Sequence, residues 1–259
     1  MLPLKHLGGD KMAKNKLQLE NVKRYHYMIL GYETFPKILK TLSDELDFYR
    51  IAKMGDVSGK EIMYDVPDNT LSENGIILSK QYENGRVMFK VRKISLLPEE
   101  MKLPSKKFIL QELDSDAEPK DYSLQISSAI ENSFSTPFTI DLDAFVREVV
   151  PKIEINVQSE RYQIIGGTGY RGELFYEIST YQDLETKKKV QKEGVVLKLP
   201  TDDISQKEND FILDIIDRKI KGLGLYNMSR YELAKKALHG EDEEEKVYDE
   251  DVKNEDEEE

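Results

Sequence analysis

The stretch EIMYDVPDNTLSENGIILSKQYENGRVMFKVRK, residues 61–93, decides the fold of this chain. It predicts a short strand, an irregular segment with one helical turn that ends at Gly75, and two strands joined at Asn84-Gly85. Asn-Gly is a strong hairpin signal, because a two-residue primed turn needs positive φ at both central positions. The strand after this turn alternates between two faces, one carrying Arg86, Met88, Lys90 and Arg92 and the other carrying Val87, Phe89 and Val91.

This cationic face has two interpretations. In the first, Arg86, Lys90 and Arg92 form the solvated face of a half-buried antiparallel strand, which is the usual reason for such alternation. In the second, they line a closed barrel and bind a polyanion. The strand alone favours the first interpretation.

Composition excludes several kinds of site. The chain of 259 residues has no cysteine, so it has no disulfides and no thiolate ligands, and a reducing compartment is expected. It has three histidines, which makes a structural zinc site improbable and leaves carboxylates as the expected ligands for any metal. No membrane-spanning run or signal peptide is visible, so we expect a cytoplasmic protein.

Most of the net charge of −12 lies in one terminal segment. Residues 241–259 hold thirteen acidic residues and two lysines, a charge of −11, which leaves −1 for residues 1–240. Such a segment cannot bury enough apolar area to fold, so we predict a disordered acidic tail that acts mainly as a solubiliser. Its alternatives are a decoy for basic proteins or an autoinhibitory mimic of an anionic ligand.

The opposite end of the chain is predicted to be a disordered leader, residues 1–15. Gly8-Gly9 can be encoded by a bacterial ribosome-binding sequence, and it lies just upstream of Met12. We therefore expect translation to begin at Met12 and the source to be bacterial or a bacterial virus. The intact mass of natively expressed protein would test this, since a mass that includes residues 1–11 excludes it.

Strands and helices are predicted throughout residues 16–240. Strands are expected at 16–30, 48–53, 106–113, 152–157, 161–165, 173–180 and 194–199, in addition to those of the hairpin stretch. Helices are expected at 34–46, at 204–221 and 229–238, and in a helical segment near 122–150. The fold class is α+β, either an antiparallel β-barrel (tunnel) of about eight strands with helices packed outside or a sheet with one solvated face.

Residues 64–80, YDVPDNTLSENGIILSK, resemble the signature of the CYTH family, the triphosphate tunnel metalloenzymes. The resemblance continues in order through FKVRK (89–93), KIEINVQSERY (152–162), ELFYEIS (173–179) and SRYELAKKAL (229–238). It implies a tunnel of eight antiparallel strands, in which cations bind a triphosphate and glutamates hold Mg²⁺ or Mn²⁺. The family includes inorganic and thiamine triphosphatases, adenylate cyclases and some RNA 5′-triphosphatases.

The chain departs from the family pattern at several ligand positions. The first-strand motif E-x-E-x-K falls on Gln18, Glu20 and Val22, or on Lys23, Tyr25 and Tyr27. Two family arginines fall on Ser79 and Gln81, and Lys80 has the parity that points out of the tunnel. The resemblance then implies phosphate binding by Lys90, Arg92, Lys152, Arg161 and Lys198, metal binding by Glu154 and Glu177, and catalysis by Glu177. Glu154 and Glu177 have an alternative role, which is to pair with these cations across the barrel.

Two functions remain open. The first is a Mg²⁺- or Mn²⁺-dependent triphosphate hydrolase, and the second is a catalytically inactive tunnel that binds a triphosphate, a nucleotide or another polyanion, or a protein partner. The missing first-strand carboxylates favour the second, whereas the family resemblance favours the first. DNA is disfavoured because there is no basic excess and no tryptophan. The sequence leaves the substrate and the oligomeric state open.

Overall fold

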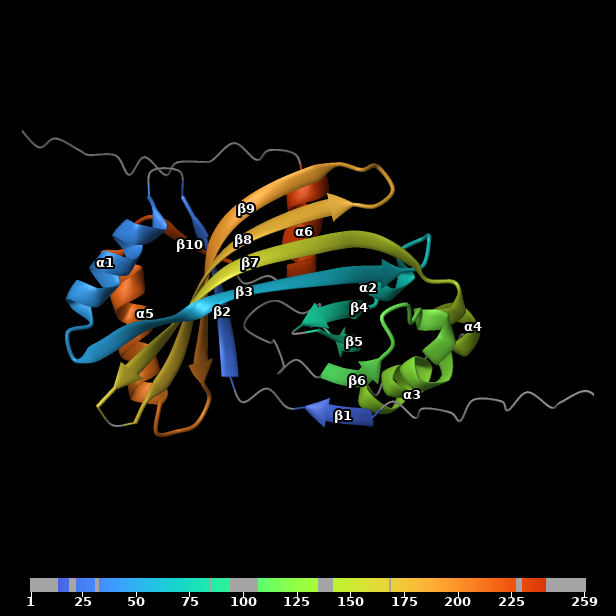
Figure 1. The fold of residues 1–259 in the computed structure, drawn as a ribbon, viewed down its shortest axis with the longest axis horizontal. Helices are drawn as coiled ribbons and strands as arrows, with labels where there is room; N and C mark the ends of the chain where they lie inside the picture. The colour runs from blue at the N-terminus through green and yellow to red at the C-terminus, as the bar shows by residue number, and fades with distance from the viewer. Residues whose placement is uncertain are drawn as a thin grey trace, which may run out of the picture.

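The fold is built around one antiparallel sheet of ten strands (Figure 1). The computed structural model describes residues 14–18, 22–30, 33–83, 85–93, 107–134, 142–167, 169–226 and 230–240. The strands are β1 (Lys14–Gln18), β2 (Val22–Ile29), β3 (Tyr49–Asp65), β4 (Ile76–Glu83), β5 (Arg86–Lys93), β6 (Lys107–Leu113), β7 (Val150–Gly166), β8 (Arg171–Asp183), β9 (Lys189–Pro200) and β10 (Leu223–Tyr226). The helices are α1 (Phe35–Glu45), α2 (Thr70–Glu73), α3 (Ser123–Phe134), α4 (Leu142–Arg147), α5 (Gln206–Lys219), α6 (Arg230–His239) and the 3-10 helix η2 (Pro119–Tyr122).

The strand order is β1-β6-β5-β4-β3-β7-β8-β9-β2-β10, so β1 and β2 lie near opposite ends of the sheet. Yet only four chain steps separate Gln18 from Val22, a span of at most about 14 Å. The sheet must therefore curve until its two ends come close together. Within the described residues, no hydrogen-bonded ladder joins the edge strands β1 and β10, so the expected tunnel is a wrapped sheet rather than a barrel closed by hydrogen bonds.

The α+β class and the antiparallel arrangement are confirmed, and the main differences concern strand boundaries. The segments 152–157 and 161–165 belong to one long strand, β7, and 48–53 is continuous with the Glu61 strand in β3. The predicted strand 16–30 is divided into β1 and β2, and β10 was not predicted. Strand β1 begins inside the predicted leader, whereas the predicted acidic tail lies outside the described residues.

The stretch at 61–93 has the predicted local structure. Strand β3 leads into helix α2, and Asp65 caps this helix by accepting hydrogen bonds from the backbone N–H groups of Leu71 and Ser72, both at 3.0 Å. Gly75 adopts φ 72° after the helix, as a left-handed C-terminal residue requires. Strands β4 and β5 pair as a hairpin with Gly85 at φ 73°.

The two faces of the sheet have different coverings. The face that we call the outer face packs against α1 and α5 at one end, where Leu42 and Ile212 are fully buried, and against α3 and α4 at the other end, where Ile126 and Val146 are fully buried. Figure 1 shows these two helical groups at opposite ends of the sheet.

The other face, the inner face, carries α6. Tyr231, Ala234 and Leu238 of this helix cover an apolar area made by Met63, Ile77, Ile153, Ile155, Val157 and Tyr181. The remainder of the inner face carries polar and charged side chains together with a few apolar ones, namely Ile109, Phe175 and Val196.

Candidate anion-binding site

Strand pairing brings charged side chains from six strands together on the inner face. Ser79 on β4 is opposite Lys90 on β5, and Arg92 is two residues further along that strand. On the other side, Glu173 of β8 is opposite Lys198 of β9, which is itself opposite Arg24 of β2. Because residues directly opposite one another project from the same face, these groups share one surface with Glu61 of β3 and Arg161 of β7.

Glu61 is the most deeply buried acid of this surface, with 4% of its area exposed. Its Oε1 accepts a hydrogen bond from Arg92 Nη2 at 3.1 Å. Burial would raise the pKa of Glu61, but the charges of Arg92, Lys90 and Arg230 outweigh burial and lower the pKa to about 2. Glu61 is therefore an anion at any physiological pH, held by surrounding cations.

Glu177 on β8 is bound by the first residue of α6. Arg230 Nη2 lies 2.8 Å from Glu177 Oε2 and 3.1 Å from Glu177 Oε1, which forms an ion pair at the boundary between the apolar and polar parts of the inner face. The pKa of Arg230 is raised by Glu177, so its guanidinium stays charged although it is largely buried. This pair fixes the beginning of α6 on the sheet.

His26 on β2 lies in the same environment and is neutral. Burial, and next the charge of Arg230, lower the pKa of His26 to about 4. A neutral imidazole adds a hydrogen-bonding group without adding to the positive charge of the site.

Arg161 and Lys198 belong to the same surface. Arg161 pairs with Glu173, and 42% of the Arg161 side chain remains accessible. Lys198 lies 3.9 Å from the centre of the Phe175 ring, a cation–π contact, and its pKa is lowered by burial and by Arg24. Burial is the main cause of this lowered pKa, and repulsion from Arg24 adds to it, so an anion beside Lys198 would favour its charged form.

The structure brings together five of the seven site residues predicted from the sequence. Lys90, Arg92, Arg161, Lys198 and Glu177 all belong to the inner face. Lys80 lies on the outer face, as its parity predicted, where its Nζ donates to the carbonyl oxygen of Ala117 at 2.6 Å.

Two predicted residues lie elsewhere. Glu154 is opposite Ile62, on the outer face, and pairs with Lys60 at 2.8 Å. Lys152 lies at the irregularity where β7 leaves its regular register with β3, and its Nζ donates to the Pro67 carbonyl oxygen at 3.1 Å. Glu154 therefore cannot share a metal ion with Glu177 in this arrangement, because the sheet separates them.

Four residues of the site were not predicted, namely Arg24, His26, Glu61 and Arg230. Glu61 opens the stretch that decides the fold, and its alternation with Met63 could have assigned it to the inner face. Arg24 and His26 share one face of β2 with Val22, where one placement of the first-strand motif ended, whereas the other placement used Lys23, Tyr25 and Tyr27 on the opposite face. Arg230 lies in the predicted helix 229–238, where no site residue was predicted.

The carboxylates of the described chain do not suit a divalent metal. No group of three or more His, Asp or Glu side chains there is arranged to hold a cation. Glu61, Glu173 and Glu177 each bind an arginine instead. The Mg²⁺ or Mn²⁺ site implied by the family resemblance does not fit the side chains in this arrangement.

No family model and no curated protein sequence matches this chain. Among solved structures it is similar to a candidate adenylyl cyclase from Hippeastrum that has a dominant triphosphatase activity, with TM-score 0.49, 10% identity and coverage of 82% of this chain and 94% of that chain. It is also similar to a candidate adenylate cyclase from Bacillus halodurans, with TM-score 0.43, 10% identity and coverage of 78% and 89%. A protein from Pyrococcus horikoshii gives TM-score 0.42, 10% identity and coverage of 82% and 97%.

These similarities concern the course of the chain alone, and all three TM-scores lie below 0.5. In the described part of the chain, no helix has the length and apolar character needed to cross a membrane.

Proposed function

We propose that the inner face binds a linear polyanion of the triphosphate class, such as tripolyphosphate or the phosphate chain of a nucleotide. The observation that carries this proposal is the convergence of Arg24, Lys90, Arg92, Arg161, Lys198 and Arg230 on a surface with only three described carboxylates, Glu61, Glu173 and Glu177. Cations gathered at a partly buried surface repel one another, so an anionic ligand would stabilise them.

The arginines retain donors for such a ligand. Arg92 Nε and Arg161 Nε are both buried, and neither donates a hydrogen bond to any other described residue. Guanidinium groups form bidentate hydrogen bonds with phosphate oxygens, so one N–H already directed at a carboxylate leaves others for phosphate. Several cations along the surface match several phosphates better than a single phosphate or a carboxylate.

Binding is better supported than metal-dependent hydrolysis. Hydrolysis by the route that the family resemblance implies would need a metal held by Glu154 and Glu177, and these side chains lie on opposite faces of the sheet. The inner residues can bind and orient phosphate and neutralise its charge. Glu177, the predicted catalytic residue, instead holds Arg230.

Calorimetric titration with tripolyphosphate, ATP and thiamine triphosphate tests the proposal, together with phosphate release in the presence of Mg²⁺ or Mn²⁺. Because a hydrogen bond to a charged group contributes about 1.5–3 kcal/mol, Arg161→Gln should weaken tripolyphosphate binding about 10- to 100-fold. The matched control is Arg218→Gln on α5, whose side chain is 74% exposed and should leave affinity unchanged.

Equal weakening by the Arg161 and Arg218 substitutions would exclude the inner face as the site. Metal-dependent turnover that is lost in Glu177→Gln would show that the protein is a hydrolase rather than a binding protein. Absence of binding to all three ligands would exclude the triphosphate class and leave a protein partner as the alternative.

A further inference from the structure

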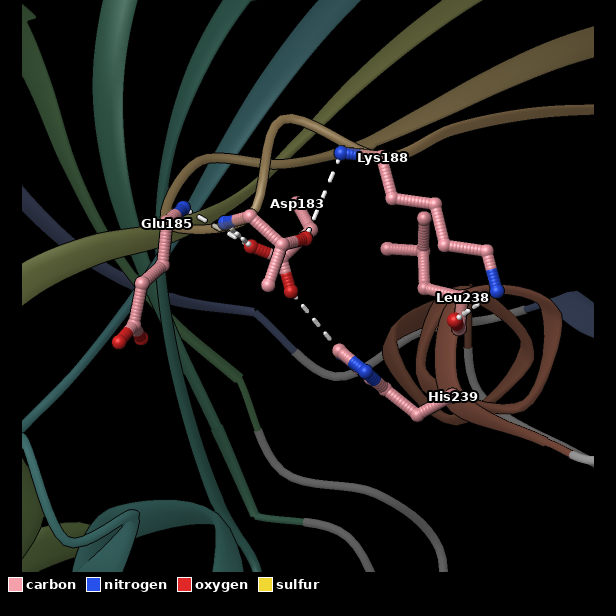
Figure 2. A network of polar contacts seen from close by, with 6 residues as sticks. Asp183, Glu185, Lys188, Leu238 and His239 are labelled. Carbon is pink, nitrogen blue, oxygen red and sulfur yellow. Dashed lines mark hydrogen bonds and ion pairs between the residues drawn. The ribbon is translucent and has the colours of Figure 1, made fainter.

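The end of α6 is fixed to the hairpin between β8 and β9 (Figure 2), at the opposite end of the helix from Arg230. His239 Nε2 lies 3.2 Å from Asp183 Oδ2, and Lys188 Nζ donates to the Leu238 carbonyl oxygen at 2.7 Å. Asp183 also accepts backbone hydrogen bonds from Glu185 and Thr186 at 2.8 and 2.7 Å. The described chain therefore leaves the sheet at a fixed point, Gly240, beside this hairpin.

The hairpin is rich in lysine. Lys187, Lys188, Lys189 and Lys192 are all exposed, and α6 adds the exposed Lys236 close to the point of exit. Within the described chain, no carboxylate lies at ion-pairing distance from the four hairpin lysines; Lys188 is directed at a carbonyl oxygen instead. These side chains surround the hairpin, which we call the lysine hairpin, with Lys192 on the inner face and Lys189 on the outer face. The hairpin lies at the place where the most acidic segment of the chain begins.

We propose that carboxylates of residues 241–259 bind the lysine hairpin of the same molecule. Charge complementarity supports this pairing, since the segment carries −11 and its first five residues, EDEEE, are all acidic. The attachment at Gly240 supports an intramolecular contact, because a short tether gives an effective concentration of about millimolar. Binding of residues 241–259 to the lysine hairpin would cover the end of α6 and help to keep this helix packed on the inner face.

The absence of cysteine allows a direct test on the full chain. A nitroxide attached to Val247→Cys should broaden the backbone amide signals of residues 187–192 at an ionic strength of about 0.01 M, where the Debye length is about 30 Å. The broadening should be lost at about 1 M salt, where the Debye length is about 3 Å, and in the triple variant Lys187→Gln/Lys189→Gln/Lys192→Gln.

A matched control separates specific contact from general attraction. Lys40→Gln/Lys207→Gln removes two exposed lysines from α1 and α5, and the broadening at 187–192 should persist in this variant. Broadening that is absent, or that survives both high salt and the triple substitution, would overturn the proposal. So would broadening that appears only between labelled and unlabelled molecules mixed together, since that places the segment on a second copy. None of these measurements depends on anion binding.

Discussion

The ion pair between Arg230 and Glu177 should hold α6 on the inner face, so removing Arg230 alone should be strongly destabilising. The pair is made through two contacts of 2.8 and 3.1 Å, and only 23% and 11% of the two side chains is exposed. Arg230→Met leaves Glu177 as an uncompensated, largely buried charge. Fully buried pairs lose about 3–5 kcal/mol when one partner is removed, and the residual exposure places this one at about 3 kcal/mol.

A second variant completes a double-mutant cycle. It separates the cost of the unpaired Glu177 charge from the cost of losing the Arg230 side chain on α6. Arg230→Met/Glu177→Gln removes both charges and should recover about 2 kcal/mol of the loss, because no unpaired ion remains. The control cycle uses Arg218 and Asp214 on α5, an exposed pair at 2.7 Å, whose single substitutions should each cost about 0.5 kcal/mol or less.

Equilibrium unfolding in urea measures both cycles without adding salt that would screen the charges. A free-energy loss for Arg230→Met no larger than that for Arg218→Met would refute a buried pair. A double variant less stable than Arg230→Met alone would refute the explanation by an uncompensated charge.

Three further predictions concern buried polar groups. The pKa of His26 is lowered from 6.5 to about 4, so between these pH values the unfolded chain binds a proton that the folded chain does not. The free energy of unfolding should therefore fall by about 3 kcal/mol as pH falls from 6.5 to 4. Urea unfolding of His26→Gln should lack this pH-dependent loss of stability. Glu61, with a pKa lowered from 4.5 to about 2, should contribute stability that is complete above pH 4.5 and lost by about pH 2, so the stability difference from Glu61→Gln should shrink over that range; a constant difference would contradict it. Asp65→Ala should lower the free energy of unfolding by about 2 kcal/mol, measured by heat or urea, because it removes the cap of α2. Asp68→Ala removes an exposed carboxylate and should lower it clearly less. Equal losses for the two variants would exclude capping as the cause.

Sequence alternation assigned β5 correctly and β7 incorrectly, for a physical reason. On β5 the outer residues Phe89 and Val91 are fully buried under α3, so its cations lie on the inner face as predicted. On β7 the apolar side chains Ile153 and Ile155 turn inward, because α6 packs over them there. The same period-two pattern therefore has opposite orientations in two strands of one sheet, and a pattern within one strand cannot show which face a distant helix will cover.

Arg230 illustrates the same difficulty across a longer distance. Its helix was predicted at 229–238, within a residue of its observed bounds, yet its partner Glu177 lies 53 positions earlier. Local spacing identified the helix and the strand separately. Only the packing of α6 on the inner face brings the two charges together.

The strand order also determines when this protein can fold during synthesis. Strand β2 is among the first to be made, but its hydrogen-bonding partners are in β9 and β10, and Tyr25 must wait for Leu197, 172 positions later. At ribosomal rates of about 5–20 residues per second, this delay is on the order of ten to thirty seconds. During that interval an unpaired strand is available to chaperones and to other nascent chains. A ribosome-stalled chain that stops before residue 189 should therefore be cut by protease within residues 22–29, a region that the completed sheet protects.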